Sequence, residues 1–301
     1  MATIDDSLQF VVLAPQGAEL PRSSVGLQAD RAQHERLFRE MQRLRGRVAL
    51  REEAITASSL DSSGGYPMEG DRNSWHLLRL RPDGKIAGCA RILVHPRDVI
   101  FQRLRVATSS VARSATWAKQ VRDAVESELR LARLRHLRTI EPGGWVIEEN
   151  LRGTSEAVSI ALSAFAWARI LGDCVGFLTA TVKHRSAAIL RRLGACQLEV
   201  GGTTIPAYFD PAWGCDMELL RFDTDSLNHK YDNALGSSMR RLINAPVYSA
   251  EAPRRKSTHV WFTHSRISTR FGSWVEIPGR QEVGLLAQPA ELSLHPASLS
   301  L

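Results

Sequence analysis

The stretch Gly143 to Leu171, GGWVIEENLRGTSEAVSIALSAFAWARIL, constrains the fold more than any other part of the sequence. Its apolar beginning, Gly143 to Ile147, is typical of a short buried strand. The run from Thr154 to Leu171 is apolar on nearly every side, which predicts a helix that ends with Gly172 at the C-cap position. Such a helix must be packed against other elements on most of its sides.

Strands and helices alternate around this segment. Asp30 is the expected N-cap of a basic amphipathic helix, in which Leu37, Met41 and Leu44 lie at helical spacing. The runs 75–80 and 85–94, joined by Pro82-Asp83-Gly84, predict a β-hairpin. Further expected elements are a helical region at 110–138, strands at 175–182 and 196–200, a short helix at 186–193 closed by a glycine, and a last helix after residue 232. The pattern predicts a mixed α/β (α+β) fold, with a mixed central sheet flanked by helices.

We expect three regions along the chain. Residues 1–29 carry weak signals and form a variable N-terminal lead-in, residues 30–249 form the folded domain, and residues 250–301 form a poorly ordered C-terminal tail because they lack sustained periodicity and contain many breakers. The sequence shows no convincing internal repeat.

The composition favours a globular protein with an acidic partner. With 44% hydrophobic residues among 301, the chain can bury a sizeable core. A net charge of +7 suits nucleic acid, anionic lipid, a phosphorylated cofactor or an acidic protein. The four cysteines lack the spacing of a zinc site or a disulfide framework, so we expect no metal. An acidic N-terminus without an export signal, and the lack of a long apolar run, favour a soluble cytoplasmic protein without a transmembrane segment.

The Arg152-Gly153 turn is a candidate anion site. A strand that turns through glycine into a helix leaves unpaired backbone N–H groups at the helix N-terminus, where the helix dipole also favours negative charge. Arg152 can add a bidentate contact, Gly153 permits close approach of the backbone, and Thr154 or Ser155 can cap the helix. A simple cap beside a surface arginine is the alternative interpretation.

The flanking sequence resembles the acetyl-CoA-binding core of the GNAT acyltransferase superfamily. Glu141, the segment WVIEENLRG, the buried helix, LTAT and LRRLGA follow in the order expected for that core, although Ser155 replaces a glycine of its loop motif. Within the superfamily, the motifs RLRGRV, HLL after Asp71, GCARIL, EPGGW and IPAYFDPAWGCDMELLRFD resemble the long-chain N-acyl amino acid synthases, which are relatives of the acyl-homoserine-lactone synthases. The resemblance covers roughly residues 30 to 245.

This resemblance implies an enzyme, an N-acyltransferase that moves a long-chain fatty acyl group from a thioester to the α-amine of an amino acid. The implied donor is the acyl-phosphopantetheine of acyl carrier protein, or acyl-CoA, used as a co-substrate with no permanently bound cofactor. The partners would be acyl carrier protein, which is acidic, and the amino acid substrate. No nucleic-acid-binding motif is present.

The resemblance also assigns roles to residues. Glu141 is the expected catalytic base, directly or through water, and a structural ion pair is the alternative. Leu190 stands where many GNAT enzymes have a tyrosine that protonates the leaving thiolate, and an easily leaving thiolate does not require one. The substrate and oxyanion group is Asp71, Arg91, Trp145, Val146 and Ile147; the phosphopantetheine group is Arg152, Gly153, Thr154, Ser155, His184 and Arg185; the acyl pocket is Tyr208, Phe209, Trp213 and Met217; and the carrier-docking group is Arg45, Arg47, Arg130, Arg133 and Arg135.

Two other functions remain open at this point. An acyl-homoserine-lactone synthase would need a site for S-adenosylmethionine, and its family usually continues from the strand glutamate with a Ser-Arg pair, whereas Pro142-Gly143-Gly144-Trp145 follows Glu141 here. A non-catalytic GNAT scaffold that binds an acidic partner is the second alternative.

Overall fold

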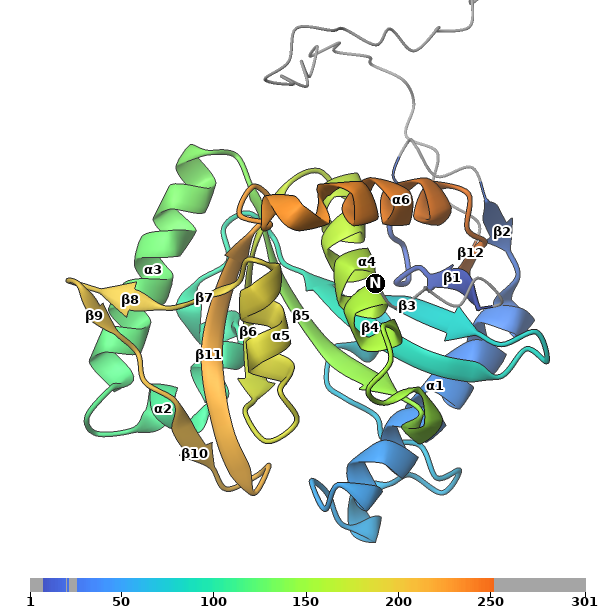
Figure 1. The fold of residues 1–301 in the computed structure, drawn as a ribbon, viewed down its shortest axis with the longest axis horizontal. Helices are drawn as coiled ribbons and strands as arrows, with labels where there is room; N and C mark the ends of the chain where they lie inside the picture. The colour runs from blue at the N-terminus through green and yellow to red at the C-terminus, as the bar shows by residue number, and fades with distance from the viewer. Residues whose placement is uncertain (1–7, 20, 22–25, 252–301) are drawn as a thin grey trace, which may run out of the picture. The chain divides into compact units, whose positions relative to one another are not determined.

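The computed structural model describes residues 8–19, 21 and 26–251. Most strands join one mixed sheet in the order β10-β11-β6-β5-β4-β3-β1-β12-β2, with β7 paired to β11, while β8 and β9 form a separate two-stranded sheet (Figure 1). The strands are β1 Gln9–Leu13, β2 Leu27–Ala29, β3 Ser74–Leu80, β4 Ile86–Val94, β5 Arg138–Ile147, β6 Cys174–Thr181, β7 Cys196–Gln197, β8 Glu199–Val200, β9 Thr203–Thr204, β10 Tyr208–Asp210, β11 Cys215–Asp223 and β12 Val247–Ser249. The expected mixed sheet is confirmed.

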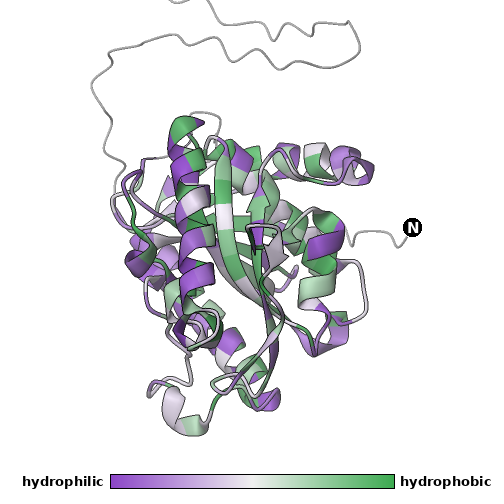
Figure 2. Cartoon of the chain, turned by 90° about the vertical axis from the view of Figure 1, so that its left-hand side faces the viewer, coloured by the Kyte–Doolittle hydropathy of each residue, from purple (hydrophilic) through white to green (hydrophobic). Residues whose placement is uncertain are grey.

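Helices cover both faces of this sheet. They are α1 Arg31–Arg51, α2 Ser110–Arg113, α3 Ala118–Leu134, α4 Glu156–Ile170, α5 Ser186–Leu193 and α6 Asp232–Ile243. Alternate strand residues separate the two faces: Val11 and Leu13 of β1 pack in the core under α1, whereas Phe10 and Val12 pack in the core formed with α4, α5 and α6. The core under α3 lies on the α1 side, since Phe177 and Leu219 alternate with Leu178 and Leu220 of the opposite core. Figure 2 shows the hydrophobic strands between helices that carry many hydrophilic residues.

Helix α1 forms as its sequence predicts. The Asp30 side chain accepts a hydrogen bond from the Gln33 N–H at 2.9 Å, which is an N-cap contact. Leu37, Met41 and Leu44 are all buried beneath the helix. Burying three such side chains stabilises the helix against the sheet by several kcal/mol, at about 1.5–3 kcal/mol each.

The expected hairpin and the closing glycine of α5 are also confirmed. β3 and β4 pair antiparallel from Ser74 opposite Leu93 to Leu80 opposite Ile86. Gly194 follows α5 with φ of +125°, and a Cβ there would stand 2.2 Å from the Ser226 carbonyl oxygen. Only glycine fits this close approach, which is why the helix ends here.

The lead-in expected at residues 1–29 is wrong for residues 9–13 and 27–29. Strand β1 lies inside the sheet, antiparallel to β3 and parallel to β12, with Val12 opposite Leu77 and Val247. Its alternating side chains enter two cores, so the segment is a buried structural strand. The expected tail, 250–301, lies outside the described residues from 252 onward.

Candidate active site

A split in the sheet between β5 and β6 creates the candidate site. The two strands pair in parallel only from Arg138 opposite Cys174 to Ile140 opposite Gly176. Beyond this point β5 stays paired with β4, and β6 stays paired with β11, so the two halves of the sheet diverge (Figure 1). The separated part of β5 begins at Glu141.

The sequence of β5 explains part of this divergence. Pro142 follows Glu141 and has no N–H to donate to a neighbouring strand. Opposite Ala90 of β4, the pairing shifts by one residue between Gly143 and Val146, which is a β-bulge containing Gly144 and Trp145. Gly144 has φ of +55°, a conformation that favours glycine. The motif EPGGW therefore bends β5 along β4 at the split.

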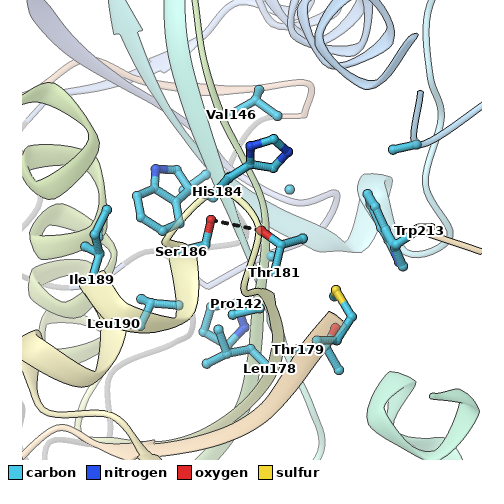
Figure 3. A pocket seen from close by; sticks show the side chains of 18 of the residues that line it. Pro142, Val146, Leu178, Thr179, Thr181, His184, Ser186, Ile189, Leu190 and Trp213 are labelled. Atoms are coloured by element: carbon cyan, nitrogen blue, oxygen red, sulfur yellow. Dashed lines mark hydrogen bonds between the residues drawn. The ribbon is translucent and has the colours of Figure 1, made fainter. Parts of the chain in front are cut away.

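A cavity of about 1230 Å³ occupies this split. On the α4 and α5 side its walls are largely apolar, and Figure 3 shows Ile189 and Leu190 on one side of the cavity with Trp213 on the other. Among the described lining residues are eight arginines and lysines but only three aspartates and glutamates. An elongated, partly apolar ligand with negative charge suits such a cavity.

A buried cluster around Asp71 lies at the α1 side of the cavity. The Asp71 carboxylate accepts hydrogen bonds from Arg45, at 2.9 Å from Nη1, from Arg91 Nη1 at 3.2 Å, and from Gln42 Nε2 at 3.1 Å. The Met68 N–H donates a further bond at 2.9 Å. Burial alone would raise the pKa of Asp71, but Arg45 and the other donors outweigh it and hold that pKa far below its usual range. Asp71 is therefore a carboxylate that fixes two arginines.

Two expectations change with this cluster. Arg45 is only 2% exposed, so its assignment as a carrier-docking residue is wrong: its charge is paired inside the protein with Asp71. Asp71 itself does not line the cavity, whereas Arg91 and Arg45 do. Burial lowers the pKa of His76 to about 4, and its Nε2 lies 2.8 Å from the Asp71 carbonyl oxygen, so His76 is a neutral packed residue.

Glu141 is buried at the point where the strands separate, and it lines the cavity. One carboxylate oxygen, Oε1, accepts the Val106 N–H at 3.0 Å; the other, Oε2, accepts the Arg105 N–H at 2.9 Å and lies 2.8 Å from His95 Nε2. These contacts hold the short 3₁₀ segment Arg105–Thr108 against β5. A carboxylate offers about four acceptor positions, so about one remains, on Oε1.

The turn before α4 and the start of α5 meet at the cavity through a carboxylate that the sequence did not suggest. Glu52, just after α1, contacts Arg152 Nη2 at 2.5 Å and His184 Nε2 at 3.0 Å. Burial alone would raise the pKa of Glu52, but Arg152 and His184 together lower it. Two residues expected to bind phosphopantetheine are therefore neighbours, and both face the same anion.

The other residues of the turn have distinct places. Gly153 has φ of +76° and lines the cavity, and the Thr154 hydroxyl accepts the Glu156 N–H at 3.2 Å, which caps α4. Ser155 stands at the N-cap position without a capping bond from its side chain and is not a lining residue. Arg185, the residue before α5, lines the cavity in a left-handed conformation with φ of +59°.

The four expected acyl-pocket residues divide into two pairs. Trp213 and Met217 line the cavity. The expectation is wrong for Phe209, which is 60% exposed, and for Tyr208, which packs in the core under α3. Tyr208 lies opposite Met217 in the pairing of β10 with β11, so both side chains point to the same face of the sheet, and the adjacent Phe209 points to the other face. Trp145, Val146 and Ile147, predicted for the substrate and oxyanion group, line the cavity, and so does Leu190.

The remaining docking candidates are exposed. Arg47, Arg130 and Arg133 lie on the surfaces of α1 and α3. Arg135 is 44% exposed, and its guanidinium is paired with Asp223 and Asp225. Its charge is already neutralised within the chain, which weakens it as a docking residue.

The sequence did not single out Arg105, or the pair of Arg79 and Glu156. Arg79 Nε lies 3.0 Å from Glu156 Oε2, and both side chains are almost fully buried between β3 and the first turn of α4. No periodic signal links residues 77 positions apart. Arg105 falls in a strongly basic region, 101–138, that looks like charged surface in sequence.

Comparisons with known proteins give matches only at the level of structure. A search of protein-family models and a search of curated proteins found no match. The CoA-dependent acyl-homoserine lactone synthase BjaI, solved with SAM and isopentyl-CoA, matches with a TM-score of 0.50 and 11% identity over 82% of this chain and 95% of its own. The chain has the GNAT fold.

Another similar structure belongs to the relatives that the sequence motifs suggested. FeeM, an N-acyl amino acid synthase from uncultured soil microbes, shares 14% identity over 72% of this chain and 92% of its own, with a TM-score of 0.43. At such identities the comparison concerns the fold alone. In the described part of the chain, no helix is long and apolar enough to cross a membrane, and no group of His, Cys, Asp and Glu is arranged to hold a metal ion.

Proposed function

We propose that this protein is an acyltransferase that moves a long-chain acyl group from a phosphopantetheine thioester to the α-amine of an amino acid. The observation that carries the proposal is the cavity in the split sheet, which joins an apolar region beside α4 and α5 to a cluster of buried arginines beside α1. A thioester donor and a charged acceptor can approach each other there from opposite faces of the sheet.

The donor would lie along the separated edges of β5 and β6. Strand edges that do not pair offer backbone N–H and C=O groups, which suit the amides of a pantetheine arm. The acyl chain would contact Leu178, Ile189 and Leu190, and the phosphate would replace the Glu52 carboxylate beside Arg152 and His184. The helix N-terminus, the Arg152 guanidinium and the His184 imidazole would all donate hydrogen bonds to this anion.

The reaction forms one bond and breaks another. The neutral amine nitrogen attacks the thioester carbonyl carbon, a C–N bond forms, the C–S bond breaks, and the pantetheine sulfur leaves as a thiolate. The amine proton passes to Glu141, directly or through water, at the acceptor position left on Oε1. Backbone N–H groups near Trp145 to Ile147 are the proposed donors to the oxyanion. Burial raises the pKa of the Cys215 thiol, which argues against a covalent acyl-cysteine route.

Acyl carrier protein is the proposed donor, with acyl-CoA as its substitute. Carrier proteins are acidic, and the exposed arginines Arg47, Arg130 and Arg133 belong to a chain with a net charge of +7. Replacing these three arginines by serine should raise the KM for the carrier-bound donor and leave the KM for acyl-CoA almost unchanged.

The test is product formation in cells. A bacterium expressing the chain should release N-acyl amino acids into the medium, detectable by mass spectrometry, and a matched strain expressing Glu141→Gln should release far less. If neither strain releases such products, the result contradicts the proposal.

The similarity to BjaI favours one second candidate, an acyl-homoserine-lactone synthase. This function needs S-adenosylmethionine as the acceptor. Incubation of the purified protein with an acyl thioester and S-adenosylmethionine distinguishes the two: release of an acyl-homoserine lactone and methylthioadenosine supports the second candidate, and N-acyl amino acids formed from free amino acids support the first.

A further inference from the structure

Arg105 supplies a positive charge at the cavity that its surroundings do not neutralise. Its side chain lines the cavity, and its Nη1 is buried without a hydrogen-bond partner among the described residues. Arg91 is nearby: burial first, and then the charge of Arg105, lower the pKa of Arg91 to about 10. Two guanidinium groups that repel each other beside a cavity favour an anion between or against them.

The local charges leave room for one more anion. Arg45, Arg91 and Arg105 contribute three positive charges at this end, and the facing carboxylates are Asp71 and Glu141. Asp71 binds Arg45 and Arg91, while Glu141 binds backbone N–H groups and His95 instead of the Arg105 side chain. The Arg105 guanidinium is therefore the one of the three without a carboxylate among the described residues.

The two glycines of EPGGW keep these guanidinium groups open to the cavity. A Cβ on Gly144 would stand 3.3 Å from Arg45 Nη1 and 3.4 Å from Arg91 Cβ, and one on Gly143 would stand 4.0 Å from Arg91 Nη2. Larger side chains at these positions would cover the charged groups. The absence of side chains at Gly143 and Gly144 thus leaves the guanidinium groups open to a ligand, in addition to its effect on the bulge.

The backbone of Arg105 is fixed by the residue expected to take the amine proton. Glu141 Oε2 accepts the Arg105 N–H at 2.9 Å, and the Thr108 hydroxyl donates to the Arg105 carbonyl oxygen at 2.8 Å. An amino acid carries its amine and its carboxylate on one carbon atom. A carboxylate held by Arg105 therefore keeps the amine at the end of the cavity that Glu141 lines.

We propose that Arg105, with Arg91 beside it, binds the α-carboxylate of the acceptor and makes the enzyme select amino acids over simple amines. This inference rests on the proposed acyl transfer, which it deepens by naming the specificity-determining residue. Loss of a charge-assisted contact to a carboxylate corresponds to a change of about 10- to 100-fold in affinity.

The test compares ligands that differ only in the carboxylate. Binding of N-dodecanoyl-phenylalanine and of N-dodecanoyl-phenethylamine is measured by calorimetry with the wild type, Arg105→Met and Arg103→Met, in which an exposed arginine nearby is the matched control. The wild type and Arg103→Met should prefer the acid by about 10- to 100-fold, and Arg105→Met should lose most of this preference, because only Arg91 then remains beside the carboxylate. Arg105→Lys, which keeps the charge, should retain an intermediate preference and serves if the methionine variant does not fold.

Acyl transfer is followed in parallel with phenylalanine and phenethylamine as acceptors. Arg105→Met should raise the KM for phenylalanine and leave the rate with phenethylamine and the KM for the donor within about twofold of the wild type. An equal loss with both acceptors, or an unchanged preference for the acid in Arg105→Met and Arg105→Lys, would overturn the carboxylate site. A protein that binds the acid selectively but transfers no acyl group would contradict the proposed function and leave the site in place.

Discussion

Replacing Asp71 by asparagine should destabilise the protein strongly, because among the described residues Asp71 is the only carboxylate that forms an ion pair with Arg45 and Arg91. Both arginines are 2% exposed. Asparagine keeps one acceptor oxygen but cannot balance two buried guanidinium groups. Breaking a buried ion pair by removing one partner costs about 3–5 kcal/mol, so we expect a loss of this size in the free energy of unfolding at neutral pH.

The pH dependence of this effect has a definite sign. The pKa of Asp71 is lowered on folding, so its contribution is fully present above the unfolded pKa, near 3.9, and declines as the pH falls toward the folded pKa. The difference between the wild type and Asp71→Asn should therefore be constant from neutral pH down to about 5 and shrink in more acidic solution.

Urea unfolding followed by circular dichroism measures both effects, with Asp98→Asn, at an exposed aspartate, as the control for an aspartate-to-asparagine change. A loss below about 1 kcal/mol in Asp71→Asn, or a difference that grows in acid, would refute the reasoning. If the Asp71→Asn variant is destabilised but still folds, it should also show a raised KM for the acceptor, because Arg91 is no longer held in place.

Four further predictions follow from the site and its supports. Glu52→Gln should lower the KM for acyl-CoA several-fold, because it removes the carboxylate that competes for Arg152 and His184. The control Glu53→Gln, at an exposed neighbouring position, should leave this KM unchanged. A raised KM in Glu52→Gln would show instead that Glu52 orients Arg152. Glu141→Gln should reduce kcat by about 100-fold or more with little change in donor binding measured by calorimetry, and equal activity would remove Glu141 from the mechanism. Ile189→Trp should narrow the cavity and reduce kcat/KM for long-chain donors more than for short-chain donors, whereas the exposed Val182→Trp should treat both alike. Arg79→Met and Glu156→Gln should each cost about 3–5 kcal/mol in urea unfolding, and the Arg79→Met/Glu156→Gln double variant should cost less than their sum; strict additivity would contradict the buried pair.

The elements predicted correctly from sequence are those whose signals are local. For α1, the cap residue Asp30 comes directly before the helix, and the apolar residues recur at every turn. For α5, the terminating glycine, Gly194, comes directly after the last helical residue. β1 was missed because its partners are remote: Val12 lies opposite Leu77 on one side and Val247 on the other. A five-residue strand has too few residues to show the period that would identify it.

The site was predicted unevenly for the same reason. Arg152 and His184 were expected at the donor site and do lie together, but the carboxylate that joins them, Glu52, is 100 positions from Arg152 in the sequence. Arg45 was misplaced because a charged residue in a basic helix looks exposed until its partner is known, and that partner, Asp71, lies 26 positions away. Arg105 gives no sequence signal of its own, because only its place at the cavity and its buried Nη1, which has no hydrogen-bond partner among the described residues, distinguish it from its basic neighbours.

The central claim is tested most directly by thiol release from the purified protein. The protein is incubated with a long-chain acyl carrier protein or acyl-CoA, with and without a mixture of amino acids, while free thiol is measured and the products are identified by mass spectrometry. We predict thiol release that depends on amino acids and matches N-acyl amino acid formed one for one, and that falls sharply in Glu141→Gln. Thiol release no faster than the background without protein, for every donor and amino acid, would contradict the account.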